Sequence, residues 1–410
     1  MVSEYIQAKG YSFKYQRISH QLSLRDLAQQ LGVSHTLIAN LEKGIMQPTD
    51  DLIAKYHAFF KLPIENDETF YGHIYDCLIK TFDAILFHDF QELEVKKETL
   101  VLMKEQAYQK GLKFHWDLCF FIIHSHHYLE VLNLDPKLAE HLAKMGEDLN
   151  PFLRFLLDVT LALYDRYHFR LTASKKRLER LASGYLNPHH KALVKDRLSD
   201  LYYHTFDRSK AIKYGAEAIQ TYQVFHNTNR AILTEIKISL YGKRQHTFEK
   251  DLPYQHLIDQ ANVYKLYEVI HDISYVWALR VFRFQRFQEA KNILRTLDLS
   301  HPQFYHYYVI VLFGSNDIET LKDFLKNQPL KAPHIEVFKP SIEYIKAYLN
   351  KKEDDVLERY LIQYLKATIK EELYGESRWA ENLLNDFYIE RRRYKEATHL
   401  KESLIELILT

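Results

Sequence analysis

Three kinds of hydrogen-bonding side chain lie close together between residues 34 and 43. This stretch carries an imidazole at His35, a hydroxyl at Thr36 and an amide at Asn40. If the stretch is helical, these side chains avoid its apolar stripe and face outward. An amide can bond adenine bidentately, and threonine can offer its hydroxyl or touch a thymine methyl group. The pattern therefore indicates a helix face with the chemistry needed to read DNA bases.

The residues around this face predict two short helices joined by a tight turn. Ser23 can cap a helix over residues 24–31, and Ser34 can cap the next helix, which runs to about residue 43. Gly32 lies between them and permits the left-handed conformation that a three-residue turn needs. Apolar side chains repeat at helical spacing on both helices: Leu24, Leu27, Ala28, Leu31, Leu37, Ile38 and Leu41. Two helices joined in this way place the second in the major groove.

This part of the chain resembles the Cro/phage-repressor type of helix-turn-helix. The pattern A-x-x-L-G-V-S, followed by I, E and G, is present as Ala28, Leu31, Gly32, Val33, Ser34, Ile38, Glu42 and Gly44. A first helix that ends near His20 and a fourth helix over residues 51–60 complete a domain expected to span residues 1–63. The resemblance implies that His35, Thr36 and Asn40 reach base edges, and that Arg17 and Glu42 form an internal ion pair.

Other polar residues of this domain are suited to the DNA backbone. We expect Arg25, Ser34 and Lys43 to contact phosphates, which position a protein without conveying sequence. The charge is small, because residues 1–62 hold seven Lys and Arg against five Asp and Glu. The weak charge leaves open an alternative in which the motif serves only dimerisation or protein binding.

The composition of the 410 residues predicts an all-α protein. Only 11 Gly and 10 Pro occur, while 47% of the residues are hydrophobic, so turns and helix breaks are few. Cys77 and Cys119 are predicted to be buried free thiols in a reducing compartment. No apolar run exceeds seven residues and the N-terminus has no apolar leader segment, so a soluble, cytoplasmic protein is expected.

The remainder, residues 64–410, is expected to be a degenerate tetratricopeptide-like α-solenoid. Amphipathic helices are separated by short breaks, and one spacing of large, small and aromatic or aliphatic residues, followed by Ala, recurs three times. The aligned sets are Leu198, Ser199, Tyr202 and Ala211; Trp277, Ala278, Val281 and Ala290; and Leu384, Asn385, Tyr388 and Ala397. The pattern resembles the tetratricopeptide repeat, in which small residues let paired helices approach closely. Such arrays leave a concave face that can hold a peptide.

The combination of both parts resembles the peptide-pheromone receptors of Gram-positive bacteria and their phages, the Rap/Rgg/NprR/PlcR/PrgX superfamily. Its length and divergent repeats look most like the NprR and arbitrium-receptor branches. The resemblance implies a homodimeric transcription regulator of the quorum-sensing or lysis–lysogeny type. A short signalling peptide would bind the repeats and control operator binding.

Candidate peptide-binding residues follow from the repeat alignment and from this resemblance. The alignment places polar and aromatic side chains on the concave face: Asp200, Tyr203, His204, Tyr275, Arg283, Asn382 and Asp386. By position, Asn227, Asn229 and Arg230 resemble the family's backbone and carboxylate clamp. A C-terminal helix with Leu400, Leu404, Ile405, Leu407 and Ile408 is either a dimer interface or a cap on the solenoid.

Readings from other classes of protein fit the sequence less well. No two glycines lie closer than 12 residues apart, which excludes the glycine-rich phosphate loops of common nucleotide enzymes. His124, His126, His127 and Glu130 could suggest a metal site, but core-like flanks favour packing and surface histidines. We therefore expect no enzyme activity, no metal and no cofactor. A scaffold that acts on a partner protein, with DNA binding secondary, remains the alternative.

Overall fold

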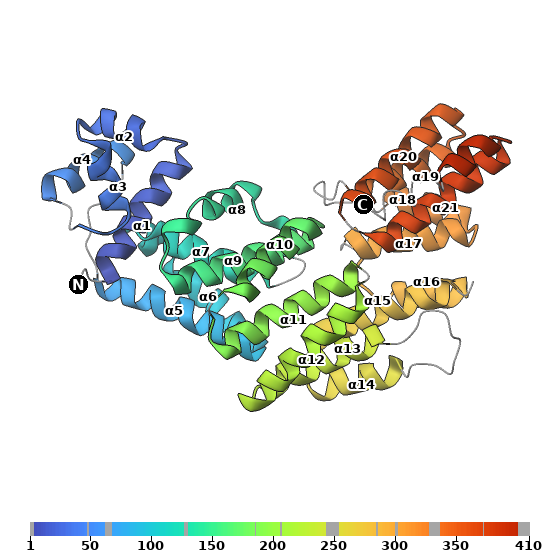
Figure 1. The fold of residues 1–410 in the computed structure, drawn as a ribbon, viewed down its shortest axis with the longest axis horizontal. Helices are drawn as coiled ribbons and strands as arrows, with labels where there is room; N and C mark the ends of the chain where they lie inside the picture. The colour runs from blue at the N-terminus through green and yellow to red at the C-terminus, as the bar shows by residue number, and fades with distance from the viewer. Residues whose placement is uncertain are drawn as a thin grey trace. The chain divides into compact units, whose positions relative to one another are not determined.

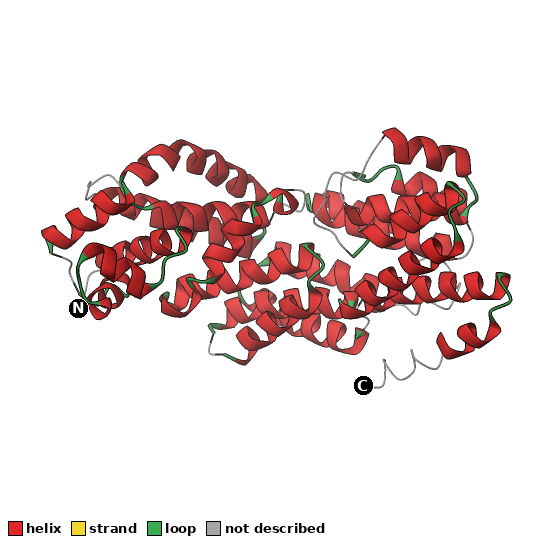
Figure 2. Cartoon of the chain, turned by 90° about the horizontal axis from the view of Figure 1, so that it is seen from above, coloured by secondary structure: helices red, strands yellow, loops and turns green. Residues whose placement is uncertain are grey.

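The computed structural model describes an all-α chain. The described residues are 4–46, 49–61, 68–126, 130–184, 186–205, 207–242, 254–283, 286–299, 302–327, 337–371 and 373–400. Within these ranges every regular element is a helix, and no strand occurs (Figure 2). Among the same residues, no helix combines the length and apolar character needed to cross a lipid bilayer. The predicted fold class is confirmed, whereas the solenoid and its repeats stay predictions.

The chain divides into two compact units. Unit 1 comprises residues 1–167 and 176–194, and unit 2 comprises residues 168–175 and 195–410. The helices up to the first boundary are α1 (Glu4–Ser19), α2 (Leu24–Leu31), α3 (His35–Glu42), α4 (Asp50–Phe60), α5 (Glu68–Phe87), α6 (Phe90–Gln109), α7 (Lys113–Ser125), the 3-10 turns Val131–Asn133 and Gly146–Asp148, α8 (Pro136–Ala143) and α9 (Pro151–Tyr167) (Figure 1). The functional division expected at residue 63 stays a prediction.

The later helices include two that contain residues of both units. These two are α10 (Leu171–Ser183) and α11 (Pro188–His204). The others belong to unit 2: α12 (Arg208–Val224), α13 (Thr228–Gly242), α14 (Tyr254–Val263), α15 (Tyr267–Arg283), α16 (Phe287–Leu294), α17 (Pro302–Gly314), α18 (Ile318–Asn327), α19 (Lys339–Leu349), α20 (Asp354–Lys370) and α21 (Tyr374–Glu390). Helices adjacent in sequence pack on each other, as α12 does with α13 and α20 with α21.

The first four helices enclose a core that contains five of the seven predicted stripe residues, while the other two, Leu24 and Leu37, pack at its edge. Nine side chains form it: Phe13, Leu27, Ala28, Leu31, Ile38, Leu41, Leu52, Tyr56 and Phe60. The Tyr56 hydroxyl donates a 2.6 Å hydrogen bond to the Phe13 carbonyl oxygen, so the single polar group of this core is satisfied. The predicted boundaries of α2 agree with the structure. The first helix ends at Ser19, next to the predicted end near His20.

Close backbone contact joins α1 to the end of α3. Gly44 has a φ of +63°, and a Cβ atom there would lie 2.5 Å from Cα of Gln7. A Cβ on Gly10 would lie 2.7 Å from the carbonyl oxygen of Leu41. Both positions therefore require glycine, Gly44 for conformation and space and Gly10 for space alone.

Helix α1 is also fastened to the helices that follow the first four. The Tyr15 hydroxyl donates a 2.7 Å hydrogen bond to the Asp117 carboxylate of α7, and the Tyr15 ring packs on Phe114. Lys14 Nζ lies 2.5 Å from the Asp148 carboxylate. Burial, together with the Asp117 charge, raises the pKa of Tyr15, so this phenol stays a hydrogen-bond donor at ordinary pH. The four-helix element is thus anchored within unit 1.

The aligned positions of the expected repeats lie at helix–helix contacts in unit 2. Leu198, Tyr202 and Ala211 are buried, and the Ser199 hydroxyl donates a 2.6 Å hydrogen bond to the Ala211 carbonyl oxygen. In the other two sets all members are buried except Trp277 and Asn385, which are half-buried. The Ser199–Ala211 hydrogen bond brings α11 and α12 into close contact, while the repeat assignment stays a prediction.

Candidate nucleic-acid interface

The turn between α2 and α3 has the geometry that its sequence predicted. Ser23 Oγ accepts a hydrogen bond from the Asp26 backbone N–H, and the Asp26 carboxylate accepts one from the Ser23 N–H, at 3.1 and 3.0 Å. This reciprocal pair lowers the pKa of Asp26, mainly through the bond to Ser23. Gly32 adopts a left-handed conformation with φ +67°, and Ser34 Oγ accepts from the Leu37 N–H at 3.2 Å. The predicted caps and turn are therefore confirmed.

Helix α3 presents a polar face opposite its buried one. Ile38 and Leu41 are in the core, with 0% and 2% of their surfaces exposed. His35 and Thr36 are exposed and Asn40 is half-buried, so all three side chains are available on the outer side of the helix. The face combines an imidazole, a hydroxyl and an amide at the N-terminal part of a well-capped helix. Such groups can exchange hydrogen bonds with base edges.

A buried ion pair fixes α1 against α3. Arg17 Nε and Nη2 each lie 2.7 Å from one carboxylate oxygen of Glu42, and Nη1 donates to the Leu22 carbonyl oxygen at 2.8 Å. Burial raises the pKa of Glu42, and the Arg17 guanidinium opposes this shift. The predicted internal ion pair is confirmed. Its bidentate geometry leaves little freedom for α3 to rotate against α1.

The residues expected to contact phosphates lie on the surface. Arg25, Ser34 and Lys43 are all exposed, at the first turn of α2 and at the two ends of α3. Since Arg17 is committed to Glu42, Arg25 and Lys43 are the exposed cations of the two-helix motif itself. Contact of these residues with DNA stays a prediction.

Three of the predicted peptide-binding residues lie in the packing between α11 and α13. Asp200 is 2% exposed and its carboxylate accepts a 2.8 Å hydrogen bond from Lys237. Arg230 is 2% exposed, with Nη1 at 3.6 Å from Asp196, and Asn227 caps α13 by accepting from the Arg230 N–H at 3.3 Å. These side chains already have partners within the chain, so a peptide would have to compete for them.

The other predicted peptide-binding residues lie in different surroundings. Tyr275 is buried, and its hydroxyl accepts a 2.8 Å hydrogen bond from the Gln303 amide. Burial and the charge of Glu376 raise the pKa of Tyr275. Tyr203 and His204 are half-buried and Asn229 is exposed, as are Asn382 and Asp386 on α21. The side chain of Arg283 and residues 401–410 of the expected C-terminal helix lie outside the described part of the chain.

The remaining candidate groups for chemistry are engaged in packing and pairing. His124 Nδ1 lies 2.7 Å from the Glu130 carboxylate, and His126 Nδ1 lies 2.8 Å from the Ile122 carbonyl oxygen, while His127 lies outside the described residues. Over the described ranges, no group of three or more His, Cys, Asp or Glu side chains is arranged to hold a metal ion. Cys77 and Cys119 are buried free thiols, as predicted, while the reducing compartment stays a prediction.

Comparisons with known proteins point to the first four helices. A helix-turn-helix family model matches residues 13–65. The chain is also 43% identical over 53 residues to an uncharacterized HTH-type transcriptional regulator of Methanocaldococcus jannaschii. That alignment covers 13% of this chain and 80% of the archaeal protein. The family match therefore lies in the four-helix element that contains α2 and α3.

Proposed function

Because the chain belongs through residues 13–65 to the helix-turn-helix family of transcriptional regulators, we propose that α3 reads an operator sequence in the major groove. The observation that carries the proposal is the outer face of α3, where His35 and Thr36 are exposed and Asn40 is half-buried. Arg25 and Lys43 would contact DNA backbone phosphates on either side of the groove. The Arg17–Glu42 pair supports this function by holding α3 in one orientation.

The substitution Asn40→Ala tests this reading of the α3 face. A bidentate amide–adenine contact contributes about 1–3 kcal/mol of discrimination, so specific binding should fall by roughly 5- to 150-fold while the fold is retained. The measurement is a gel-shift titration against the duplex that the full chain selects from a random-sequence library. Asn262→Ala, an exposed amide on α14, is the matched control. If Asn40→Ala binds the selected duplex as tightly as the parent chain, Asn40 does not read a base.

We also propose that residues 64–410 bind a short signalling peptide and that the protein acts as a homodimer. Two recognition helices, one from each protomer, would then bind two half-sites one helical turn apart. Binding at two half-sites would compensate for the small basic charge of a single helix-turn-helix domain. The peptide can change operator binding only by binding the competent and incompetent arrangements with different affinities. Candidate contacts are Tyr203 and Tyr275, and the exposed Asn382 and Asp386 of α21.

The α11–α13 packing offers a route for recognition of the peptide carboxylate. Arg230 Nη1 lies 3.6 Å from Asp196, which is longer than a charge-assisted hydrogen bond, so a peptide carboxylate could compete with Asp196 for this guanidinium. Asp196 lies on α11, and Thr234 of α13 also donates a hydrogen bond to it at 3.1 Å. Displacing Asp196 from Arg230 would therefore weaken the contact between α11 and α13. We propose Asp200, Asn227, Arg230 and Arg283 as residues that a bound peptide would engage.

The decisive experiment combines operator and peptide. Bound DNA is mapped genome-wide in the host, and binding to the recovered operator is measured with synthetic peptides encoded beside the gene. A peptide that binds the purified protein and shifts operator affinity supports the proposal. Specific DNA binding with no response to any such peptide would instead favour a repeat domain that binds a partner protein.

A further inference from the structure

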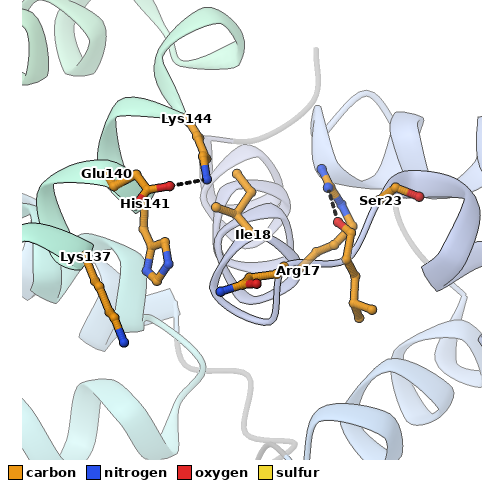
Figure 3. A pocket seen from close by; sticks show the side chains of 9 residues that line it. Arg17, Ile18, Ser23, Lys137, Glu140, His141 and Lys144 are labelled. Carbon is orange, nitrogen blue, oxygen red and sulfur yellow. Dashed lines mark hydrogen bonds and ion pairs between the residues drawn. The ribbon is translucent and has the colours of Figure 1, made fainter.

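A cleft lies between α8 and the connection from α1 to α2. Its volume is about 410 Å³. Figure 3 shows Glu140, His141 and Lys144 of the α8 segment facing Ile18 of α1 across it. The residues that line the cleft are Arg17, Ile18, Gln21, Leu22, Ser23, Lys137, Glu140, His141 and Lys144. All of them belong to unit 1, and the comparisons with known proteins cover only the wall formed by α1 and α2.

Helix α8 turns one face to the core and the other to this cleft. Leu142 and Met145 are completely buried on the inner side. Lys137 and Lys144, with His141 between them, recur at helical spacing on the cleft side. We call Lys137, His141 and Lys144 the α8 basic face. Because Lys14 of α1 reaches the carbonyl oxygen of Met145 at 3.5 Å, the basic face is held beside α1 rather than carried on a loop.

The charges on the α8 basic face are available to an external anion. Lys137 is exposed, and the structure gives its ammonium group no ion pair among the described residues. Lys144 lies 2.6 Å from Glu140, but both side chains are more than half exposed, at 53% and 61%. Such a surface pair is weak because both side chains stay solvated, so a phosphate can displace the carboxylate at little cost. His141 packs edge-on against the Tyr15 ring, which positions it at the cleft.

The opposite wall of the cleft is the start of α2. Ser23 is the N-cap of this helix, and Gln21 and Leu22 precede it. In a helix-turn-helix the first helix of the motif crosses the DNA backbone while the second lies in the groove. The strand that passes the start of α2 therefore runs next to the α8 basic face. Among the residues of this wall that line the cleft, Arg17 is paired with Glu42, and Arg25 of the first turn of α2 does not line the cleft.

We infer that α8 is a second DNA-contacting element, whose basic face binds backbone phosphates adjacent to those at the start of α2. This inference rests on the proposed DNA-binding function and extends its interface beyond residues 13–65. It adds two lysines and a histidine to the few cations of the first 62 residues, from a segment that begins 75 residues after them in the sequence. Contacts of this kind raise affinity for every sequence equally.

The test removes the two lysines from the full-length chain. The double variant K137Q/K144Q is titrated with the selected operator duplex and with a random-sequence duplex across a range of salt concentrations. The slope of log K against log salt is negative, and each lost phosphate contact reduces its magnitude by about 0.9. The magnitude should therefore decrease by about 1 to 2. Affinity at 0.1 M salt should fall on the order of tenfold for both duplexes, leaving the specificity ratio unchanged.

A matched control separates this contact from a general loss of charge. K80Q/K176Q removes two exposed lysines of unit 1 that do not line the cleft, and its salt slope should stay near that of the parent chain. If the slope of K137Q/K144Q is unchanged, the inference about α8 is wrong. The proposed DNA-binding function still stands in that case if the parent chain binds its operator. Equal slope losses in both double variants, or competition by inorganic phosphate at millimolar concentration, also overturn it. Failure of the parent chain to select any duplex removes the proposed function itself.

Discussion

Each unit buries an arginine beside a carboxylate, and the two pairs differ in geometry. In unit 1, two nitrogens of Arg17 lie 2.7 Å from the two oxygens of Glu42. In unit 2, Arg230 Nη1 lies 3.6 Å from Asp196 although both side chains are almost fully buried. A bidentate pair defines one orientation of its helices, whereas a longer contact defines them less strictly. The difference agrees with the proposal that unit 1 holds α3 in one orientation for DNA reading and that a peptide competes for Arg230 in unit 2.

The strongest test of this comparison is the substitution of both arginines. Removing one partner from a buried ion pair leaves an uncompensated charge and costs about 3–5 kcal/mol. Arg17→Ala should therefore lower the free energy of opening of α1–α4 by this amount, and Arg230→Ala should lower that of α11–α13 by less, because its contact is longer. Hydrogen exchange followed by mass spectrometry on the full chain reports each region separately.

The control for both substitutions is an arginine without a buried partner. Arg25→Ala, on the exposed first turn of α2, should change stability by no more than about 0.5 kcal/mol. Equal losses in Arg17→Ala and Arg230→Ala would mean that the distance between the partner atoms does not distinguish the pairs. A loss confined to Arg230→Ala would reverse the comparison.

The helix-turn-helix could be predicted because its determinants are local in sequence. Ser23, Gly32 and Ser34 each act on backbone within three or four residues, and the apolar spacing identifies the inner face of α2 and α3. The Arg17–Glu42 pair joins residues 25 apart and was predicted only through family resemblance. The glycine at position 10 gave no such signal, since its requirement comes from the backbone of Leu41.

The α8 basic face and the interior position of Arg230 could not be predicted in this way. Asp135 and Pro136 form a helix-start signal, so the existence of α8 was readable from the sequence. Its place beside Ser23 depends on contacts between segments more than 100 residues apart. A polar helix start at residues 227–230 looks the same whether it faces solvent or the Asp196 carboxylate of another helix. Only packing decides between them.

Two buried histidines extend the comparison to pH. His115 in unit 1 and His306 in unit 2 are fully buried, and burial lowers the pKa of each to about 3. The usual pKa of histidine is near 6.5. Between about pH 6.5 and 3, each of these histidines therefore binds a proton in the unfolded chain but not in the folded chain. Folding stability therefore decreases as the pH falls through this window. The loss is roughly 2 kcal/mol per histidine between pH 6.5 and 5.

Substitution by phenylalanine should separate the two histidines. His306 Nε2 lies 2.8 Å from the Ser341 hydroxyl, whereas neither ring nitrogen of His115 has a hydrogen-bond partner among the described residues. His115→Phe should remove the contribution of His115 to the acid sensitivity of unit 1 at little cost near pH 7, and His306→Phe should lose a hydrogen bond as well. Urea titrations at pH 5 and pH 7.5 measure both effects. If His115→Phe keeps the full pH dependence of the parent chain, His115 is protonated in the folded state.

The smallest expected effect concerns Ser34, which caps α3 and is also a proposed phosphate contact. Ser34 Oγ accepts the Leu37 N–H, so Ser34→Ala should destabilise α1–α4 by about 1 kcal/mol, whereas Ser34→Gly should cost only a few tenths. Thermal unfolding of the full chain measures the two variants against each other. If capping is the whole role of Ser34, the glycine variant retains operator affinity. If the hydroxyl also bonds a phosphate, both variants lose affinity equally for specific and random duplexes, because a phosphate contact carries no sequence information.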